Sequence, residues 1–241
     1  MDDKTAPDHR GLKGRLYEQF ARVGKALASP ARLELLDLLS QGERSVEGLA
    51  GEAALTVKNT SAHLRVLWAA RLVERRKVPP YVLYSLAGDE VFGLVRELQT
   101  LSRGRLAEVD RLARLYFEAR DTLEPIGLGE LRRRVAVGDV VVLDVRPAAE
   151  YAAGHVAGAW SVPVEELERR LAELPGDREV IAYCRGPYCL FSLDAVELLR
   201  RHGIAARRLA GGFPDWRMAG FPVSAGVADE GEDASAGAGA A

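Results

Sequence analysis

Apolar residues recur at helical spacing through the first part of the chain, and polar residues divide the pattern into segments. The first predicted helix runs from Leu16 to Ala28. Ser29 then supplies a helix cap and Pro30 a proline at the first helical position, so a second helix is expected over 31–40, which Gly42 ends.

Two further helices are expected after this turn. Ser45 can cap a short helix over 46–50, and Thr56 can cap a longer one that runs to about Ala69. Leu64 and Leu67 should face inward on the longer helix. The pattern predicts two helices joined by a tight turn.

Two runs with strand character follow these helices, over Leu72–Lys77 and Tyr81–Leu86. Val78, Pro79 and Pro80 separate them, which predicts a hairpin with a tip that proline stiffens. Helix, turn, helix and hairpin in this order are typical of a winged helix-turn-helix.

A long amphipathic pattern comes next and is interrupted near Gly104. Heptad-like spacing is compatible with packing inside its own domain and with a dimer seam, and both can be true. A homodimer would suit a protein that reads paired half-sites on DNA. The stripe consists of Val91, Leu94, Leu98, Leu101, Val109, Leu112 and Tyr116.

The periodicity changes after residues 123–127, where Leu-Glu-Pro-Ile-Gly marks the expected joint between two domains. Strands are predicted over 140–145, 180–183 and 206–209, and helices over 164–174, 191–202 and 215–219. This alternation indicates an α/β domain with a parallel sheet covered on both faces. Ligands in such sheets bind at the carboxyl ends of the strands, and Cys184 follows one of them.

Length and composition fit this division. The chain has 241 residues, 48% hydrophobic and 28% charged, as is usual for a globular protein with two domains. We expect a flexible arm over 1–13, a mainly α winged-helix domain over 14–122, an α/β domain over 123–224, and a disordered acidic tail over 225–241.

The start of the chain is acidic where a secretory signal would be basic, and no stretch reaches the ~18 unbroken apolar residues of a membrane span. A cytoplasmic location without membrane attachment is expected.

Charge is distributed unevenly along the chain. Residues 1–122 contain 20 Lys and Arg against 17 Asp and Glu, whereas residues 123–241 contain 13 against 18. Between Leu55 and Ser85 the only acidic residue is Glu74. A basic cluster on one small unit suits contacts with phosphates. Its members are Lys58, Arg65, Arg71, Arg75, Arg76 and Lys77.

The segment from Leu55 to Leu67, followed by Ala70-Arg71-Leu72-Val73, resembles the recognition helix of ArsR-type winged-helix repressors. The resemblance covers about residues 16–120 and implies a homodimer that binds double-stranded operator DNA. Polar side chains at the start of such a helix can reach base edges, while basic residues of the wing touch flanking phosphates. The candidates are Thr56, Lys58, Asn59, Ser61 and Arg65 on the helix, with Arg75, Arg76 and Lys77 in the wing.

One histidine and the segment before the recognition helix also bear on this interpretation. His63 is expected to be half-buried rather than to contact DNA. Many ArsR-type sensors carry a cysteine pair in the preceding helix, but residues 45–50 of this chain contain no thiol. The signal must therefore enter elsewhere.

Both cysteines lie in one short segment, Ala182 to Cys189, between an apolar run and a helical pattern. Backbone amides and the dipole of the following helix can stabilise a thiolate there. The four-residue gap and the absence of a second Cys or His pair in the sequence disfavour zinc, and no metal or cofactor is expected. We expect a sulfur-binding loop formed by Cys184, Arg185, Gly186, Pro187, Tyr188 and Cys189.

Five motifs over about residues 126–224 resemble a rhodanese domain. They are Leu143 to Pro147, Glu150-Tyr151, Gly154 to Ala159, the loop at Cys184, and Gly211 to Trp216. The resemblance implies that Cys184 takes a sulfane sulfur from a donor, becomes a persulfide and passes the sulfur on. A Cys-x5-Arg phosphate loop is disfavoured because Leu190 stands where its arginine would be.

The other polar residues of this region have expected roles. Arg185, the loop amides and the next helix should lower the pKa of the Cys184 thiol. Asp144, Arg146 and Glu150 are expected to form ion pairs beside the loop rather than to catalyse, and His155 and Trp216 to pack.

Two residues depart from common rhodaneses. Pro187 removes one loop amide. Cys189 could resolve a persulfide on Cys184 by thiol exchange, or simply pack as a small apolar residue.

These observations favour a homodimeric repressor whose rhodanese-like domain senses reactive sulfur species or thiol oxidants. A sulfurtransferase that carries a DNA-binding domain is the alternative. A third hypothesis is a binding module without cysteine chemistry.

Overall fold

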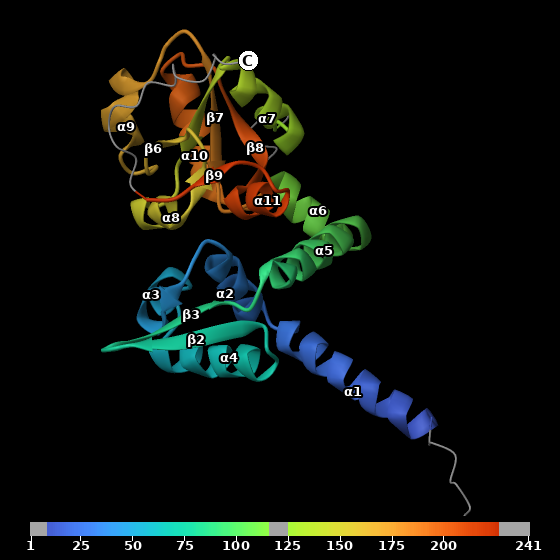
Figure 1. Cartoon of the computed structure of the whole chain (residues 1–241). Coiled ribbons are helices and arrows are strands. Elements are labelled where there is room, and N and C mark those ends of the chain that lie inside the picture. Colours follow the sequence, from blue (N-terminus) through green and yellow to red (C-terminus); the bar gives the residue numbers. More distant parts are fainter. Residues whose placement is uncertain (1–8, 116–124, 227–241) are drawn as a thin grey trace, which may run out of the picture. The chain divides into compact units, whose positions relative to one another are not determined.

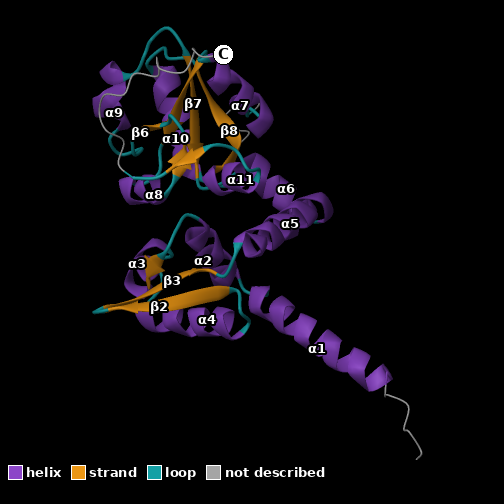
Figure 2. Cartoon of the chain, in the orientation of Figure 1, coloured by secondary structure: helices purple, strands orange, loops and turns teal. Residues whose placement is uncertain are grey.

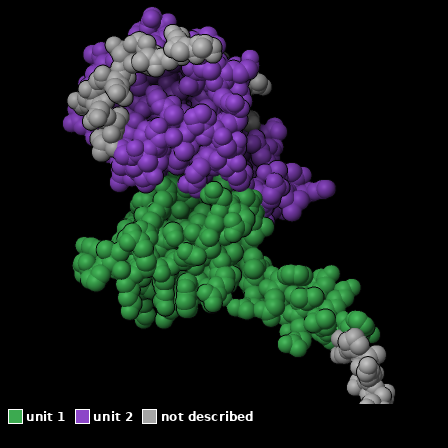
Figure 3. Space-filling view, in the orientation of Figure 1, with its two compact units in different colours: residues 1–95 green, residues 96–241 purple. Residues whose placement is uncertain are grey.

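The computed structural model describes residues 9–115 and 125–226, which fall into two compact units, Met1–Val95 and Arg96–Ala241 (Figure 3). Several predictions lie outside the described residues: the first eight residues of the arm, Tyr116 of the stripe, residues 123–124 of the joint, and residues 227–241 of the tail. No helix in the two described ranges is long and apolar enough to cross a membrane.

Four helices open the first unit (Figure 1). They are α1 (His9–Leu27), α2 (Pro30–Ser40), α3 (Val46–Glu52) and α4 (Val57–Ala69). The predicted helices are confirmed, although α1 begins inside the segment expected to be an arm.

Side-chain hydrogen bonds at the helix starts test the predicted caps. Ser45 accepts a hydrogen bond from the Gly48 amide at 3.0 Å, and Thr56 accepts one from the Asn59 amide at 3.2 Å. Ser29 stands at the cap position of α2 and Pro30 is its first residue, as predicted, but the Ser29 side chain makes no capping hydrogen bond. Arg32 in the first turn of α2 donates to main-chain carbonyls at the end of α1 and so ties the two helices together.

The wing is an antiparallel sheet in the order β1-β3-β2 (Figure 2). Strands β2 (Val73–Val78) and β3 (Tyr81–Leu86) form the predicted hairpin, and the short β1 (Arg44–Ser45) adds a third strand that the sequence did not predict. Leu64 and Leu67 of α4 are fully buried in the core of this unit, as predicted. The first unit is a winged helix-turn-helix.

The amphipathic pattern after the wing forms α5 (Asp89–Arg105) and α6 (Ala107–Ala113), which are separated at Leu106, close to the predicted break. Val91 is buried in the winged-helix core. Leu94, Leu101 and Leu112 of the same stripe are between 42% and 60% exposed in this single chain. The stripe therefore only partly packs within the chain.

The second unit contains a parallel sheet, as predicted, and the sheet has four strands where the sequence indicated three. Its order is β6 (Trp160–Ser161), β4 (Val140–Asp144), β7 (Glu179–Cys184) and β8 (Ala206–Gly212). Side chains of alternate strand residues enter two separate cores. One core includes α10 (Leu190–Arg201), and the other includes α7 (Leu128–Val137) and α11 (Phe213–Met218).

Some elements of this unit differ from the prediction. The prediction of one helix over 164–174 is wrong. Only the short helix α9 (Leu167–Arg170) and the 3-10 helix η2 (Leu171–Glu173) form there. The amides of Val162 and Val164 bind the carbonyls of Asp144 and Val145, which holds the chain extended up to this point. Several elements were not predicted from the sequence: α7, α8 (Ala148–Ala153), β5 (His155–Val156), β6 and β9 (Val223–Ser224).

Candidate functional site

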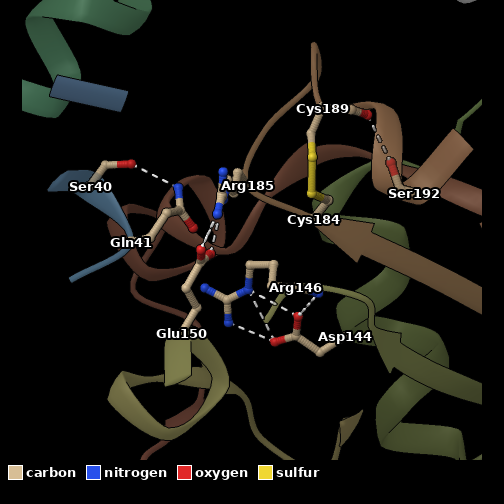
Figure 4. Close-up of a disulfide and its surroundings, with 9 residues drawn as sticks. All are labelled: Ser40, Gln41, Asp144, Arg146, Glu150, Cys184, Arg185, Cys189 and Ser192. Atoms are coloured by element: carbon tan, nitrogen blue, oxygen red, sulfur yellow. Dashed lines mark hydrogen bonds and ion pairs between the residues drawn. A yellow bond between two sulfur atoms is a disulfide. The ribbon is translucent and has the colours of Figure 1, made fainter. Parts of the chain in front are cut away.

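The two cysteines lie at the ends of one loop (Figure 4). Cys184 is the last residue of β7 and is 1% exposed, and Cys189 immediately precedes α10 and is half-buried. A disulfide joins them, with 6.2 Å between their Cα atoms. Because this Cα separation lies in the range that a disulfide spans, the loop can accommodate the bond.

The loop packs closely against the end of the neighbouring strand. A Cβ atom added at Gly212 would lie 2.3 Å from the carbonyl carbon and oxygen of Arg185 and 2.5 Å from the Gly186 nitrogen. The Gly212 amide donates to the Asp215 carboxylate at 2.8 Å, which fixes the strand end. Only glycine leaves room for the loop backbone at this position.

The amides of the loop are not all directed at the sulfur atoms. The Cys189 amide donates to the Gly186 carbonyl at 3.2 Å, and Pro187 has no amide hydrogen. The Cys189 amide is therefore not available for an anion cradle in this disulfide-bonded form, and position 187 has no amide hydrogen to add.

Asp144 and Arg146 form an ion pair whose side chains are both fully buried. The Arg146 guanidinium donates to both carboxylate oxygens, at 2.9 Å and 2.6 Å, and to the Gly154 carbonyl at 2.7 Å. Burial lowers the pKa of Arg146, but hydrogen bonding to Asp144 together with the charges of the nearby acidic groups outweighs burial, and the pKa is raised. Both groups are held in place as charges beside the loop.

Tyr183 is a third member of this cluster, and the sequence analysis missed it. Its hydroxyl donates to Asp144 and accepts a hydrogen bond from the Val156 amide at 3.1 Å. Burial, and then the nearby Asp144 carboxylate, raise the pKa of the phenol well above its usual value. Tyr183 therefore acts as a neutral donor that helps to orient Asp144.

His155 and Trp216 make packing and main-chain contacts. The His155 ring stacks on Tyr151 at 3.6 Å between centroids, and its Nδ1 lies 2.9 Å from the Tyr151 carbonyl oxygen. The Trp216 indole donates to the Pro222 carbonyl at 2.8 Å. Neither contact involves the cysteine loop.

Arg185 is paired with Glu150 of α8. Its Nε lies 2.9 Å and 3.2 Å from the two carboxylate oxygens, and a second guanidinium nitrogen also binds Glu150. The Glu150 side chain is 1% exposed and that of Arg185 15%. The carboxylate therefore offsets the guanidinium charge that the sequence placed next to Cys184.

The predicted DNA-contacting residues of α4 lie at its start and on its outer face. Thr56, Lys58, Asn59 and Arg65 are exposed, and Ser61 is half-buried. His63 is half-buried, as expected. Side chains in this position can enter a major groove, although contact with DNA remains a prediction.

Two of the three wing candidates have partners within the first unit. The Arg76 guanidinium forms a two-nitrogen ion pair with Glu43, in which Nε lies 2.7 Å from the carboxylate. The Arg75 guanidinium lies 4.2 Å from the centre of the Trp68 ring. Lys77 is exposed near the wing tip. Of these three wing residues, Arg76 is the one whose charge a carboxylate offsets, while Arg75 and Lys77 keep their full charge at the surface.

Comparison with known proteins supports both halves of this description. The model of the bacterial regulatory protein arsR family matches residues 29–75, and the rhodanese-like domain model matches residues 128–219. The chain is 44% identical to the HTH-type transcriptional regulator Rv0324 of Mycobacterium tuberculosis, over 89% of this chain and 94% of the relative. It is 33% identical to a sulfurtransferase of Allochromatium vinosum, over 39% of this chain and 83% of that protein.

A solved structure also matches the first unit in sequence. It is the homodimeric winged helix-turn-helix domain of a possible ArsR-family regulator of Mycobacterium bovis, 38% identical, with a TM-score of 0.37. The match covers 44% of this chain and 91% of that one.

The fold and the two sites define a transcriptional regulator built from a DNA-binding winged helix and a rhodanese-like domain. The chain belongs to the HTH-type transcriptional regulators of the arsR family, in a form that carries a rhodanese-like domain.

Proposed function

We propose that the protein is a repressor that binds double-stranded operator DNA as a homodimer and is controlled by sulfur chemistry at Cys184. The exposed polar start of α4 is the surface that would enter the major groove.

Exposed apolar residues on two helices support the dimer. On α1, Leu12, Leu16 and Phe20 are at least half exposed and follow each other at intervals of one helical turn. On α5, Leu94 and Leu101 are exposed as well. Apolar stripes of this kind are buried when a second copy packs against them.

The sulfur step that we propose begins with the Cys184 thiolate. It attacks the outer sulfur of a sulfane donor R–S–SH, the S–S bond of the donor breaks, and R–S⁻ leaves, so that Cys184 becomes a persulfide. The Cys189 thiolate then attacks Sγ of Cys184 and HS⁻ leaves, which forms the disulfide. Overall the two cysteines are oxidised and the donor sulfur is reduced to sulfide. A direct thiol oxidant would reach the same product.

The observation that carries this proposal is the pairing of Cys184 and Cys189 in one loop. The loop lies at the carboxyl end of β7, and its backbone rests on Gly212. We infer that breaking or forming the disulfide changes the packing of the loop against this strand end. For this change to control repression, the free energy of DNA binding must differ between the reduced and the disulfide-bonded protein.

Fluorescence anisotropy with full-length protein tests the proposal. DNA duplexes are first selected from a random library with reduced and with oxidised protein. The proposal expects polysulfide-treated and disulfide-bonded protein to behave alike and to differ at least about ten-fold in affinity from reduced protein, which is 1.4 kcal/mol of coupling. Cys184→Ser should abolish the response to polysulfide. Equal affinities in all three states would refute control by sulfur.

A second function is favoured by the buried Cys184 at the end of a parallel strand and by the similarity to a sulfurtransferase. In this case Cys184 would pass its sulfur to an external thiol instead of to Cys189. Turnover with a persulfide donor and a thiol acceptor, lost in Cys184→Ala and retained in Cys189→Ser, would support it. A single turnover that ends in the disulfide would exclude it.

A further inference from the structure

The cations beside the cysteine loop are already matched by carboxylates. Arg185 directly follows Cys184, and its guanidinium points toward Glu150 (Figure 4). Glu150 is almost completely buried, so its charge is held at this place by the protein. A carboxylate in this position both offsets the arginine and repels an incoming anion.

The second arginine near the loop is compensated in the same way. Arg146 is bound to Asp144, and both side chains are fully buried. The Arg185–Glu150 and Arg146–Asp144 pairs together carry no net charge. A dianion that reached Cys184 would lose hydration without gaining an unmatched positive charge from either pair.

The outer part of the loop is apolar. Tyr188 in the loop and Leu190 at the start of α10 are 38% and 40% exposed. The Arg185 guanidinium also lies 5.6 Å from the centre of the Phe191 ring. Such surfaces favour the organic part of a donor over a strongly hydrated inorganic anion.

We propose that the Glu150–Arg185 pair selects the donor, so that the loop accepts sulfur from organic persulfides of low charge in preference to dianionic thiosulfate. This inference rests on the proposed role of Cys184 as the sulfur acceptor. With either donor the Cys184 thiolate forms a bond to the outer sulfur. The S–S bond of the donor then breaks, and an organic thiolate leaves in one case and sulfite in the other.

The test measures sulfur addition to Cys184 in full-length Cys189→Ser protein, in which the disulfide cannot form. Benzyl persulfide and thiosulfate are the two probes, and intact mass reports the addition of one sulfur atom. The rate constant for benzyl persulfide is divided by that for thiosulfate. This ratio is then divided by the same ratio for free cysteine, which removes the intrinsic difference between the donors. Glu150→Gln is the variant, and Glu165→Gln, an exposed position of the same unit, is the matched control.

Glu150→Gln should raise the thiosulfate rate constant and lower the normalised ratio about ten-fold, since it leaves Arg185 without its carboxylate. Glu165→Gln should change neither. The double variant Glu150→Gln/Arg185→Gln removes both charges and should restore the ratio. A normalised ratio that is unchanged in Glu150→Gln would overturn the inference, and so would a ratio that stays low in the double variant.

One further measurement leaves Glu150 and Arg185 unchanged. Raising the NaCl concentration should not slow the thiosulfate reaction of the Cys189→Ser protein, because screening weakens only an attraction that exists. A marked decrease would show that the loop attracts the dianion and would overturn the inference. If neither probe adds sulfur to Cys184 in any of these proteins, the proposed function itself fails.

Discussion

Replacement of Gly212 by alanine tests whether the cysteine loop depends on its contact with β8. The new Cβ would lie 2.3 Å from the Arg185 carbonyl group, roughly 1 Å closer than ordinary van der Waals contact. The neighbouring atoms belong to the backbone and cannot rotate away. We therefore expect a cost near the upper end of the usual range for overpacking, about 3 kcal/mol.

Thermal unfolding of the reduced full-length protein, followed by circular dichroism, measures this cost. For a domain of this size the expected decrease in the melting temperature of the second unit is more than about 10 °C. Gly186→Ala is the matched control, since it lies in the same loop and its added Cβ would meet nothing within 4 Å. A Gly212→Ala protein that melts within about 2 °C of the wild type would refute the packing argument.

Three further predictions concern charges. Asp144→Asn leaves Arg146 buried without its carboxylate and should cost about 3–5 kcal/mol in urea unfolding, whereas Asp177→Asn, at a position 82% exposed, should leave the midpoint unchanged. Burial raises the pKa of Glu179, but hydrogen bonds from Arg207 and Arg134 outweigh it and the pKa is lowered. Glu179→Gln should therefore destabilise the protein at pH 7, and this difference should disappear as the pH falls below about 4, because a carboxylate with a depressed pKa stabilises the folded state only while it is ionised; a difference that does not vary with pH would contradict the argument. Lys58→Ala should weaken DNA binding and reduce the slope of log affinity against log salt by about 1, while Lys25→Ala on α1 should not; an unchanged slope in Lys58→Ala would exclude a phosphate contact.

The winged helix could be predicted because its signals are local. Thr56 and Ser45 mark helix starts through side chains that bind amides three residues ahead, and Leu64 and Leu67 mark one buried face. The same local logic gave only part of the answer at Ser29, which stands at the start of α2 but makes no capping hydrogen bond through its side chain. The sequence therefore predicts which residue stands at the cap position more securely than whether its side chain bonds there.

The position of the cysteine loop along the chain could be predicted, but the residues that pack around it could not. Cys184 follows a strand pattern, and this alone places it at the carboxyl end of β7. The fit of Gly212 against the loop and the hydrogen bond from Tyr183 to Asp144 depend on strand register, which the sequence does not reveal. The pairing of Arg185 with Glu150 joins residues 35 positions apart, so the sequence could name both residues without showing that they neutralise each other.

The central claim is that sulfur chemistry at Cys184 sets the affinity for DNA. It is tested most directly by dividing each step of a polysulfide titration into two samples, one for intact mass and one for anisotropy with a selected duplex. The account predicts that the fraction of protein carrying the Cys184–Cys189 disulfide and the change in bound DNA follow the same curve, and that Cys184→Ser shows neither. Complete conversion to the disulfide with no change in DNA affinity would contradict it.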